Sequence, residues 1–304
     1  MPRHFLSLLD YQKDELRELL DRAAWLKKTQ KKGKEHQPLR GKTLAMVFEK
    51  SSTRTRVSFE VGMFQLGGHA LNITSSASQL GRGETYADTS KVLSRYCDCI
   101  MMRTFEQSRI EEVAAAATVP VINGLTDLLH PCQIMADMQT IEENKGDISK
   151  LKVAWIGDGN NMANTWIQAA IIFGFRLTLA CPKGYEPPAI ILNEIKTGGY
   201  DNIQLFSEAA PAVKDVDVIN TDTWISMGQE SSAVEAKKNI FRPFQVNRAL
   251  LNLAKKDAIV LHCLPAHREE EITSDVMDGQ NSRIFDQAEN RLHAQKAILE
   301  RLMK

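Results

Sequence analysis

The chain has 304 residues, of which 43% are hydrophobic and 25% charged, a composition typical of soluble globular proteins. This length exceeds what one hydrophobic core usually organises, so we expect two domains. The 38 basic and 38 acidic residues cancel, which excludes a general electrostatic attraction to nucleic acid or to a membrane surface. Any anion must therefore be bound at a local site.

The N-terminal segment predicts a helix that begins near Asp10 and has one apolar face. Acidic residues within it argue against a transit peptide, and neither a signal pattern nor a bilayer-spanning apolar run is visible. The cysteines stand at positions 97, 99, 132, 181 and 263, without paired metal-ligand spacing. Scattered single thiols favour a reducing cytoplasm.

Strand-like and helix-like runs alternate along the chain, which is typical of an α/β fold with parallel sheets flanked by helices. In the first half we predict strands at Thr43–Phe48, His69–Ile73, Cys99–Met102 and Val119–Asn123. In the second half we predict strands at Lys152–Ile156, Arg176–Ala180, Ile203–Phe206, Val216–Asn220 and Ala258–Leu261. A connecting helix at Gln133–Glu143 and a polar turn after it place the domains at residues 1–143 and 148–288. The polar stretch Gln229–Lys238 predicts a loop.

The stretch Ser51-Ser52-Thr53-Arg54-Thr55-Arg56 connects the first predicted strand to a helix-like run, Val57–Leu66. The first turn of a helix has unpaired N–H groups and the positive end of the helix dipole, so it favours an anion. Arg54 and Arg56 add guanidinium groups that can donate paired hydrogen bonds to phosphate oxygens. Helix capping explains one or two of the hydroxyl residues but not the arginines. We therefore expect a phosphate-binding turn.

Three further clusters carry polar residues beside predicted helices or strands. They are His130-Pro131-Cys132-Gln133, Asp222-Thr223-Trp224-Ile225-Ser226-Met227-Gly228 and His262-Cys263-Leu264-Pro265. With the 51–56 turn, the first and last clusters resemble motifs of the carbamoyltransferases, which move the carbamoyl group of carbamoyl phosphate to an amine. The middle cluster resembles the ornithine-binding loop of the family's ornithine members. The resemblance extends from about Leu39 to the C-terminus.

The resemblance implies a carbamoyl-phosphate site made of Ser52, Thr53, Arg54, Thr55, Gln79, Arg103, His130, Gln133, Cys263, Leu264 and Arg291. Of these, the implied catalytic residues are Arg103, His130, Gln133, Cys263 and Arg291. Arg103 follows a predicted strand, and the carboxyl ends of strands are where open α/β sheets bind ligands. Without the resemblance, His130 is equally well explained as a helix cap, whereas Arg103 and Arg291 would be interpreted as surface charges.

The resemblance implies an ornithine site made of Asn161, Asp222, Ser226 and Met227. The first of these would hold the α-carboxylate, and the others the α-amino group. The stretch Gly157–Asn161 also suggests a dinucleotide-binding turn, but Met162 stands where the third glycine belongs, and Cys181 stands where an acid is expected. The dinucleotide interpretation is therefore weak.

Cys263 has two interpretations. A free cysteine at the end of an apolar strand is most often a packing residue. In the family it lies beside the ornithine side chain, where it could orient or deprotonate a δ-amine whose pKa in water is about 10.4. The backbone carbonyl of Leu264 would hold the carbamoyl NH₂ group.

The loop after the second strand separates the family's branches. Aspartate members carry a lysine there, whereas Thr74–Glu84 has Gln79 and no lysine. Members that use putrescine or acylated ornithine are nearer rivals, and Asp222 with Ser226 and Met227 favours free ornithine over both.

The resemblance thus implies that L-ornithine is converted to L-citrulline, as in arginine biosynthesis, without metal or organic cofactor. It also implies a homotrimer, or a multiple of one, with sites at subunit interfaces, and a C-terminal helix, residues 289–304, that packs back on the first domain. The alternatives are another amine acceptor, or a two-lobed ligand-binding protein that has lost the chemistry.

Overall fold

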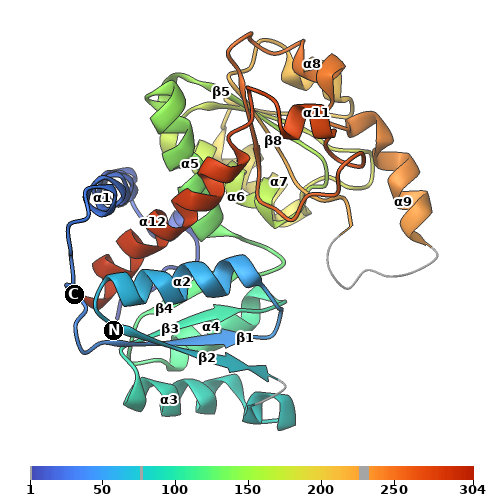
Figure 1. Ribbon diagram of the computed structural model, residues 1–304. Coiled ribbons are helices and arrows are strands. Elements are labelled where there is room, and N and C mark those ends of the chain that lie inside the picture. Colours follow the sequence, from blue (N-terminus) through green and yellow to red (C-terminus); the bar gives the residue numbers. More distant parts are fainter. Residues whose placement is uncertain (1, 76–77, 226–232) are drawn as a thin grey trace. The chain divides into compact units, whose positions relative to one another are not determined.

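The computed structural model describes residues 2–75, 78–225 and 233–304 and divides into two compact units (Figure 1). Unit 1 comprises Met1–Gln139 and Glu289–Lys304, and unit 2 comprises Thr140–Ala288. The chain passes from unit 1 to unit 2 within helix α5 (Pro131–Lys145) and returns within helix α12 (Ile284–Met303). Two helices therefore join the units. No helix in these described ranges is long and apolar enough to span a membrane.

Unit 1 contains a four-stranded parallel sheet in the order β2–β1–β3–β4. Its strands are β1 (Thr43–Phe48), β2 (His69–Thr74), β3 (Cys99–Arg103) and β4 (Val121–Leu125). Its other helices are α1 (Lys13–Lys31), α2 (Thr53–Gln65), α3 (Tyr86–Tyr96) and α4 (Gln107–Ala116). Helices α2 and α3 lie on opposite faces of this sheet (Figure 1). Alternate residues such as Ala45 and Val47 pack against α4 through Ile110 and Val113, as the two-residue period of a strand requires.

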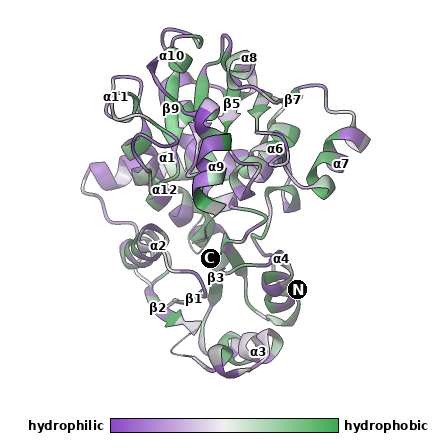
Figure 2. Cartoon of the chain, turned by 90° about the vertical axis from the view of Figure 1, so that its right-hand side faces the viewer, coloured by the Kyte–Doolittle hydropathy of each residue, from purple (hydrophilic) through white to green (hydrophobic). Residues whose placement is uncertain are grey.

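Unit 2 contains a five-stranded parallel sheet in the order β7–β6–β5–β8–β9. Its strands are β5 (Lys152–Ile156), β6 (Arg176–Ala180), β7 (Ile203–Phe206), β8 (Val218–Thr221) and β9 (Ile259–His262). Its helices are α6 (Asn161–Phe173), α7 (Ala189–Gly198), α8 (Ala209–Val213), α9 (Ala233–Phe241), α10 (Arg248–Leu251) and α11 (Ser274–Met277). Strands β5 and β9 are largely apolar (Figure 2). Strands β5, β8 and β9 are almost wholly buried, as expected for parallel strands, whereas the edge strand β7 exposes Gln204 and Leu205.

Several of the predicted elements need correction. Strand β8 begins at Val218, two residues later than predicted, and helix α12 begins at Ile284, before the predicted start at 289. Strand β4 begins at Val121, two residues later than predicted, because Pro120 has no N–H to donate to a strand ladder. The part of the predicted loop Gln229–Lys238 that the structure describes belongs to helix α9. This helix ends with Phe241, whose buried ring packs against Tyr185 and Trp224, so tertiary packing outweighs the polar composition of the segment.

Candidate active site

Each sheet has a point at which the strand order reverses. In unit 1 this point lies between β1 and β3, because β2 is on one side of β1 and β3 is on the other. In unit 2 it lies between β5 and β8. Open α/β sheets bind ligands at such switch points, beyond the carboxyl ends of the strands. The 51–56 turn follows β1 and Arg103 ends β3, whereas Asn161 follows β5 and Asp222 follows β8. The sequence candidates therefore lie at both switch points, which we call site 1 in unit 1 and site 2 in unit 2.

Site 1 begins at the N-terminus of α2. Ser52 is the N-cap: its Oγ accepts a hydrogen bond from the Thr55 backbone N–H at 3.2 Å and donates one to Thr55 Oγ1 at 3.1 Å. The first turn of α2 has no acidic residue, so the helix dipole favours an anion there. Arg54 is half-buried. Arg56 is exposed and pairs with Glu60 at 3.6 Å along the helix, so it does not join site 1.

Thr55 is the centre of site 1. Its fully buried Oγ1 accepts hydrogen bonds from Arg291 Nη2 at 2.8 Å and from Arg103 Nη1 at 3.4 Å. The two arginines are only 3% and 7% exposed. Arg291 Nη1 also donates to Gln133 Oε1 at 3.0 Å. Two buried guanidinium groups thus converge on one hydroxyl oxygen, which concentrates positive charge where a phosphate could be held.

His130 lies just before α5 and is buried within the same group of side chains. Burial, followed by the positive charges of Arg291 and Arg103, holds its pKa well below the usual value. The imidazole is therefore neutral near pH 7 and can donate one N–H without carrying charge. Four of the predicted residues come together around Thr55 in this way: Arg103 of β3, Gln133 of α5, Arg291 of α12, and His130, which precedes α5.

Gln79 is not part of this cluster. It begins a short 3₁₀ helix, Gln79–Arg82, and its side chain is exposed. Within the described residues, its side chain makes no hydrogen bond to the other residues of site 1. A single copy of the chain therefore does not bring Gln79 to the phosphate-binding turn.

Site 2 begins with a tight turn after β5. Gly157 has φ 137°, and a Cβ on Gly159 would lie 2.2 Å from Pro187 N, so glycine is required at both positions. The turn leads to Asn160, the N-cap of α6, whose Oδ1 accepts hydrogen bonds from the backbone N–H groups of the first turn. Its Nδ2 donates to Asp222 Oδ2 at 3.0 Å. Asn161, the predicted ligand, is the first residue of α6 and is half-buried.

Asp222 is the centre of site 2. Its Oδ1 accepts hydrogen bonds from Cys263 Sγ at 2.9 Å and from the Thr223 backbone N–H at 2.8 Å. The carboxylate therefore joins the ends of β8 and β9, as the strand order predicts. Ser226 and Met227 lie outside the described residues.

Asp158 was not among the predicted site residues. Its Oδ2 accepts from Lys237 Nζ of α9 at 2.7 Å. Burial raises the pKa of Asp158, Lys237 opposes that shift, and the negative charge of Asp222 adds to it. Site 2 thus contains two neighbouring carboxyl groups and one lysine. The sequence signal for Asp158 was its place in the glycine-rich turn, but no residue pattern pointed to Lys237.

Two groups of side chains in the described residues have metal-ligand composition. One is Asp222, His262 and Cys263, and the other is His267, Glu270 and Glu271. In the first group the acceptor nitrogen of His262 already binds the Leu264 N–H at 2.9 Å, and Cys263 donates to Asp222. In the second group, Lys238 donates to Glu270 at 2.7 Å. Both arrangements are accounted for by hydrogen bonds, so we assign no metal to them.

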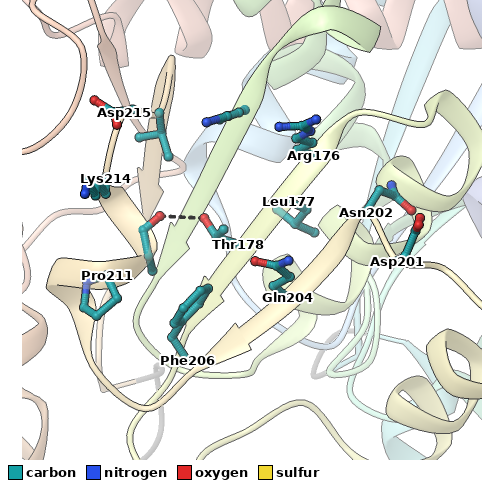
Figure 3. A pocket seen from close by; sticks show the side chains of 13 residues that line it. Arg176, Leu177, Thr178, Asp201, Asn202, Gln204, Phe206, Pro211, Lys214 and Asp215 are labelled. Carbon is teal, nitrogen blue, oxygen red and sulfur yellow. Dashed lines mark hydrogen bonds between the residues drawn. The ribbon is translucent and has the colours of Figure 1, made fainter.

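A separate hollow of about 530 Å³ lies against strands β6 and β7 and the segment 211–216 (Figure 3). Lys152 and Arg176 line it at the amino ends of β5 and β6, together with Gln204 of β7. Thr178 lies inside it and donates to Ala212 O at 2.7 Å. Because ligands of parallel sheets bind at the carboxyl ends of strands, this hollow is not the candidate active site.

The chain belongs to the aspartate/ornithine carbamoyltransferase family. Residues 3–143 match the family's carbamoyl-P binding domain and residues 149–302 its Asp/Orn binding domain. The chain is 59% identical over 303 residues to the ornithine carbamoyltransferase of Pelobacter propionicus, covering 100% of this chain and 99% of the relative. It is also similar to the solved ornithine carbamoyltransferase of Pyrococcus furiosus, with a TM-score of 0.95 and 51% identity over 99% of this chain and 97% of that one.

Proposed function

We propose that this protein is an ornithine carbamoyltransferase, which converts carbamoyl phosphate and L-ornithine to L-citrulline and phosphate. The observation that carries the proposal is the convergence of Arg103, Arg291 and His130 around Thr55 in a chain 59% identical over its whole length to an ornithine carbamoyltransferase. In this reaction the δ-amine attacks the carbamoyl carbon, the C–O bond to phosphate breaks, and the amine proton leaves with the phosphate.

Site 1 fits carbamoyl phosphate. The first turn of α2, with Ser52, Thr53, Arg54 and Thr55, would hold the phosphate oxygens through backbone N–H groups and the Arg54 guanidinium. Arg103 would bridge the phosphate and the carbonyl oxygen. Arg291 and the neutral His130 would donate to the carbonyl oxygen, where negative charge develops as the amine attacks. Gln133, whose Nε2 donates to Asp137 Oδ1 at 2.8 Å, would contact the carbamoyl NH₂.

Site 2 fits ornithine. Asn161 would hold the α-carboxylate, and Asp222, with Ser226 and the backbone of Met227, would hold the α-amino group. Cys263, which donates to Asp222, would lie beside the δ-amine and orient it. The carbonyl of Leu264 would hold the carbamoyl NH₂. These roles assign residues 1–143 and 289–304 to carbamoyl phosphate and 148–288 to ornithine, except that Leu264 also contacts the carbamoyl group. They use neither a metal nor an organic cofactor.

The test is an acceptor panel of ornithine, N-acetylornithine, putrescine and aspartate, each supplied with carbamoyl phosphate. We expect citrulline to be formed far faster than any other carbamoylated product. Preference for another acceptor would contradict the choice of ornithine, and absence of any carbamoylated product would favour a ligand-binding protein that has lost the chemistry. We do not favour either alternative, because the residues of site 1 are present and clustered.

We further propose that the active form is a homotrimer or a multiple of one. Helix α2 carries an exposed apolar row of Val57, Val61 and Phe64, and Leu71 is exposed on the edge strand β2. Positions i, i+4 and i+7 share one face of a helix, and an exposed apolar face of this kind fits a second copy of the chain. Light scattering of the purified protein would give the mass of the assembly, and a monomer would contradict the proposal.

We place the reaction in the cytoplasm, as a step of arginine biosynthesis, with small-molecule substrates and neither a nucleic-acid nor a membrane partner. The five cysteines are free thiols, which suits a reducing compartment. The zero net charge offers no attraction to nucleic acid or an anionic membrane.

A further inference from the structure

We propose that His262 and Glu271 form a buried pair that positions Cys263 and Leu264 for carbamoyl transfer. Glu271 acts through His262, and neither side chain touches a substrate. The inference rests on the proposed function, because it concerns the thiol and the carbonyl that we assign to ornithine and to the carbamoyl NH₂. It gives roles to His262 and Glu271, neither of which is among the predicted site residues.

The hydrogen bonds of His262 determine where its proton lies. His262 is the last residue of β9, and its Nδ1 lies 2.9 Å from the Leu264 backbone N–H. A backbone amide can only donate, so Nδ1 must be the acceptor. The ring proton is then on Nε2, which lies 2.9 Å from Glu271 Oε1. Both side chains are fully buried, with 0% of their surface exposed, so water does not compete for these bonds.

Leu264 needs such support because its backbone is in the left-handed region, with φ 60°. Residues with a Cβ rarely adopt this conformation unless the surroundings hold it. The hydrogen bond from the Leu264 N–H to His262 Nδ1 holds the peptide that joins Cys263 to Leu264. That peptide carries the carbonyl of Cys263, and its orientation limits where the Cys263 thiol can reach Asp222. Together with the φ of 60° at Leu264, it sets how the chain enters the next peptide, which carries the Leu264 carbonyl.

Glu271 and the backbone of His262 are themselves fixed. Glu271 Oε1 also accepts from the His267 backbone N–H at 2.6 Å, and the His262 backbone N–H donates to Gln287 Oε1 at 2.9 Å. The carboxylate therefore holds the imidazole in one tautomer and one orientation. A carboxylate that orients a histidine in this way is a common supporting arrangement at catalytic sites. In this chain the oriented histidine acts on the backbone next to the reacting groups.

The test replaces the pair without leaving a buried charge. In the double variant His262→Phe/Glu271→Leu, apolar groups of similar volume replace both partners. This removes the buried pair and takes away the acceptors of the Leu264 and His267 backbone N–H groups. We expect a folded protein that binds inorganic phosphate within twofold of the parent but has kcat lowered at least tenfold. Glu271→Gln keeps an acceptor oxygen at the same place and should keep kcat within threefold. Glu270→Gln, next to it in the sequence but paired with Lys238, is the matched control and should do the same.

Alkylation of Cys263 by iodoacetamide gives a readout that does not depend on turnover. Cys263 is the only partly exposed cysteine of the five, the others being buried. We expect the rate of its alkylation to change at least threefold in the double variant and less than twofold in Glu271→Gln. A merely structural pair would change stability but neither kcat per folded site nor this rate. A folded double variant with parental kcat and parental alkylation would overturn the proposal.

The parent enzyme provides a further test if the double variant does not fold. In ¹⁵N-histidine spectra, His262 must be the neutral Nε2–H tautomer, and its signal is identified by its shift in Glu271→Gln. A protonated Nδ1 would overturn the proposal. If the parent formed no citrulline, the proposed function would fail, while the tautomer and the alkylation rates would still show whether the pair positions the 263–264 peptide.

Discussion

Arg291 Nη2 donates a hydrogen bond to Thr55 Oγ1 at 2.8 Å, across 236 positions of the chain. Arg103 reaches the same oxygen from β3. The hydroxyl of Thr55 thus aligns two guanidinium groups beside the first turn of α2.

Replacing Thr55 with Val should disperse these arginines while the volume of the buried side chain is kept. Loss of a hydrogen bond to a charged group costs about 1.5–3 kcal/mol, so kcat/KM for carbamoyl phosphate should fall roughly 10- to 150-fold. Thr55→Ser keeps the hydroxyl and should lose much less. Steady-state kinetics at saturating ornithine would measure both. Equal losses in the two variants would show that the methyl packing, not the hydroxyl, is what matters.

Arg54→Ala should remove a charge-assisted contact to the phosphate, at a cost of about 2–4 kcal/mol in transition-state binding. Arg56→Ala is the matched control, since Arg56 is exposed and pairs with Glu60. Its activity should stay within about twofold of the parent. Isothermal titration with carbamoyl phosphate and initial rates would compare the two. The phosphate assignment would be wrong if Arg54→Ala bound carbamoyl phosphate as the parent does.

Asp222→Asn should weaken ornithine binding, because an amide cannot neutralise the α-ammonium group. Binding of carbamoyl phosphate should survive, since Asp222 belongs to unit 2 and site 1 to unit 1. KM for ornithine and Kd for carbamoyl phosphate would be measured separately. An equal loss for both substrates would indicate a folding defect instead.

Acid should destabilise the fold through His293. This buried residue of α12 has a pKa lowered to about 4, chiefly by burial and then by the charge of Lys296. The unfolded chain binds the proton below about pH 6.5, whereas the folded chain resists it until about pH 4. The stabilisation is therefore complete above about pH 6.5 and is lost as the pH falls towards 4, by up to about 3 kcal/mol. His130, whose pKa is also lowered, adds a loss of the same sign.

Melting temperatures at pH 7 and pH 4.5 would test this. The drop between the two should be smaller in His293→Gln than in the parent. His69→Gln, at an exposed position of β2, should show the parental drop. A parental drop in His293→Gln would mean that other groups cause the acid sensitivity.

Gln79 should act in the site of a neighbouring subunit, since its side chain is exposed and apart from the site 1 cluster in its own chain. Arg54→Ala and Gln79→Ala subunits, each nearly inactive, would be mixed in equal amounts, dissociated and reassembled. A site is whole when its own subunit keeps Arg54 and its neighbour keeps Gln79, so closed rings should regain about one-quarter of parental activity. Mixed rings that form but stay as inactive as their parents would argue against a shared site.

Most of the fold could be predicted because hydrophobic periodicity determines strands buried on both faces. Four strands, β1, β5, β6 and β7, have the predicted limits. The errors arise where tertiary contacts determine whether a helix forms or where it begins. Helix α9 forms in a polar segment because Phe241 is buried, and α12 begins at Ile284, five residues before the predicted start at 289. Such contacts join residues far apart in the sequence, so local patterns do not contain them.

The candidate site residues could be proposed from the sequence where they belong to a motif. The residues outside the motifs that hydrogen-bond to them could not. The structure brings together Thr55, Arg103 and Arg291, three of the residues that the resemblance implies, and their roles stay predictions. The partners of the motif residues were missed. Glu271 lies in a run of three glutamates that suggests a solvated surface, yet it is fully buried against His262. The pattern of a single sequence shows the charge and the periodicity of its residues. Which of three adjacent glutamates is buried depends on the packing of the folded chain.

Unit 2 lies, in chain order, between the two segments of unit 1. During synthesis the ribosome makes the first segment of unit 1, which includes the 51–56 turn and Arg103, then unit 2, and only afterwards Arg291. Domains usually fold in the order in which they are made. In this chain, however, the anion site of unit 1 is complete only after unit 2 has been made, because Arg291 follows unit 2 in the sequence. A nascent chain halted before α12 would therefore expose Thr55 without one of its two arginine partners, so carbamoyl phosphate could not stabilise the first unit until translation had passed residue 291.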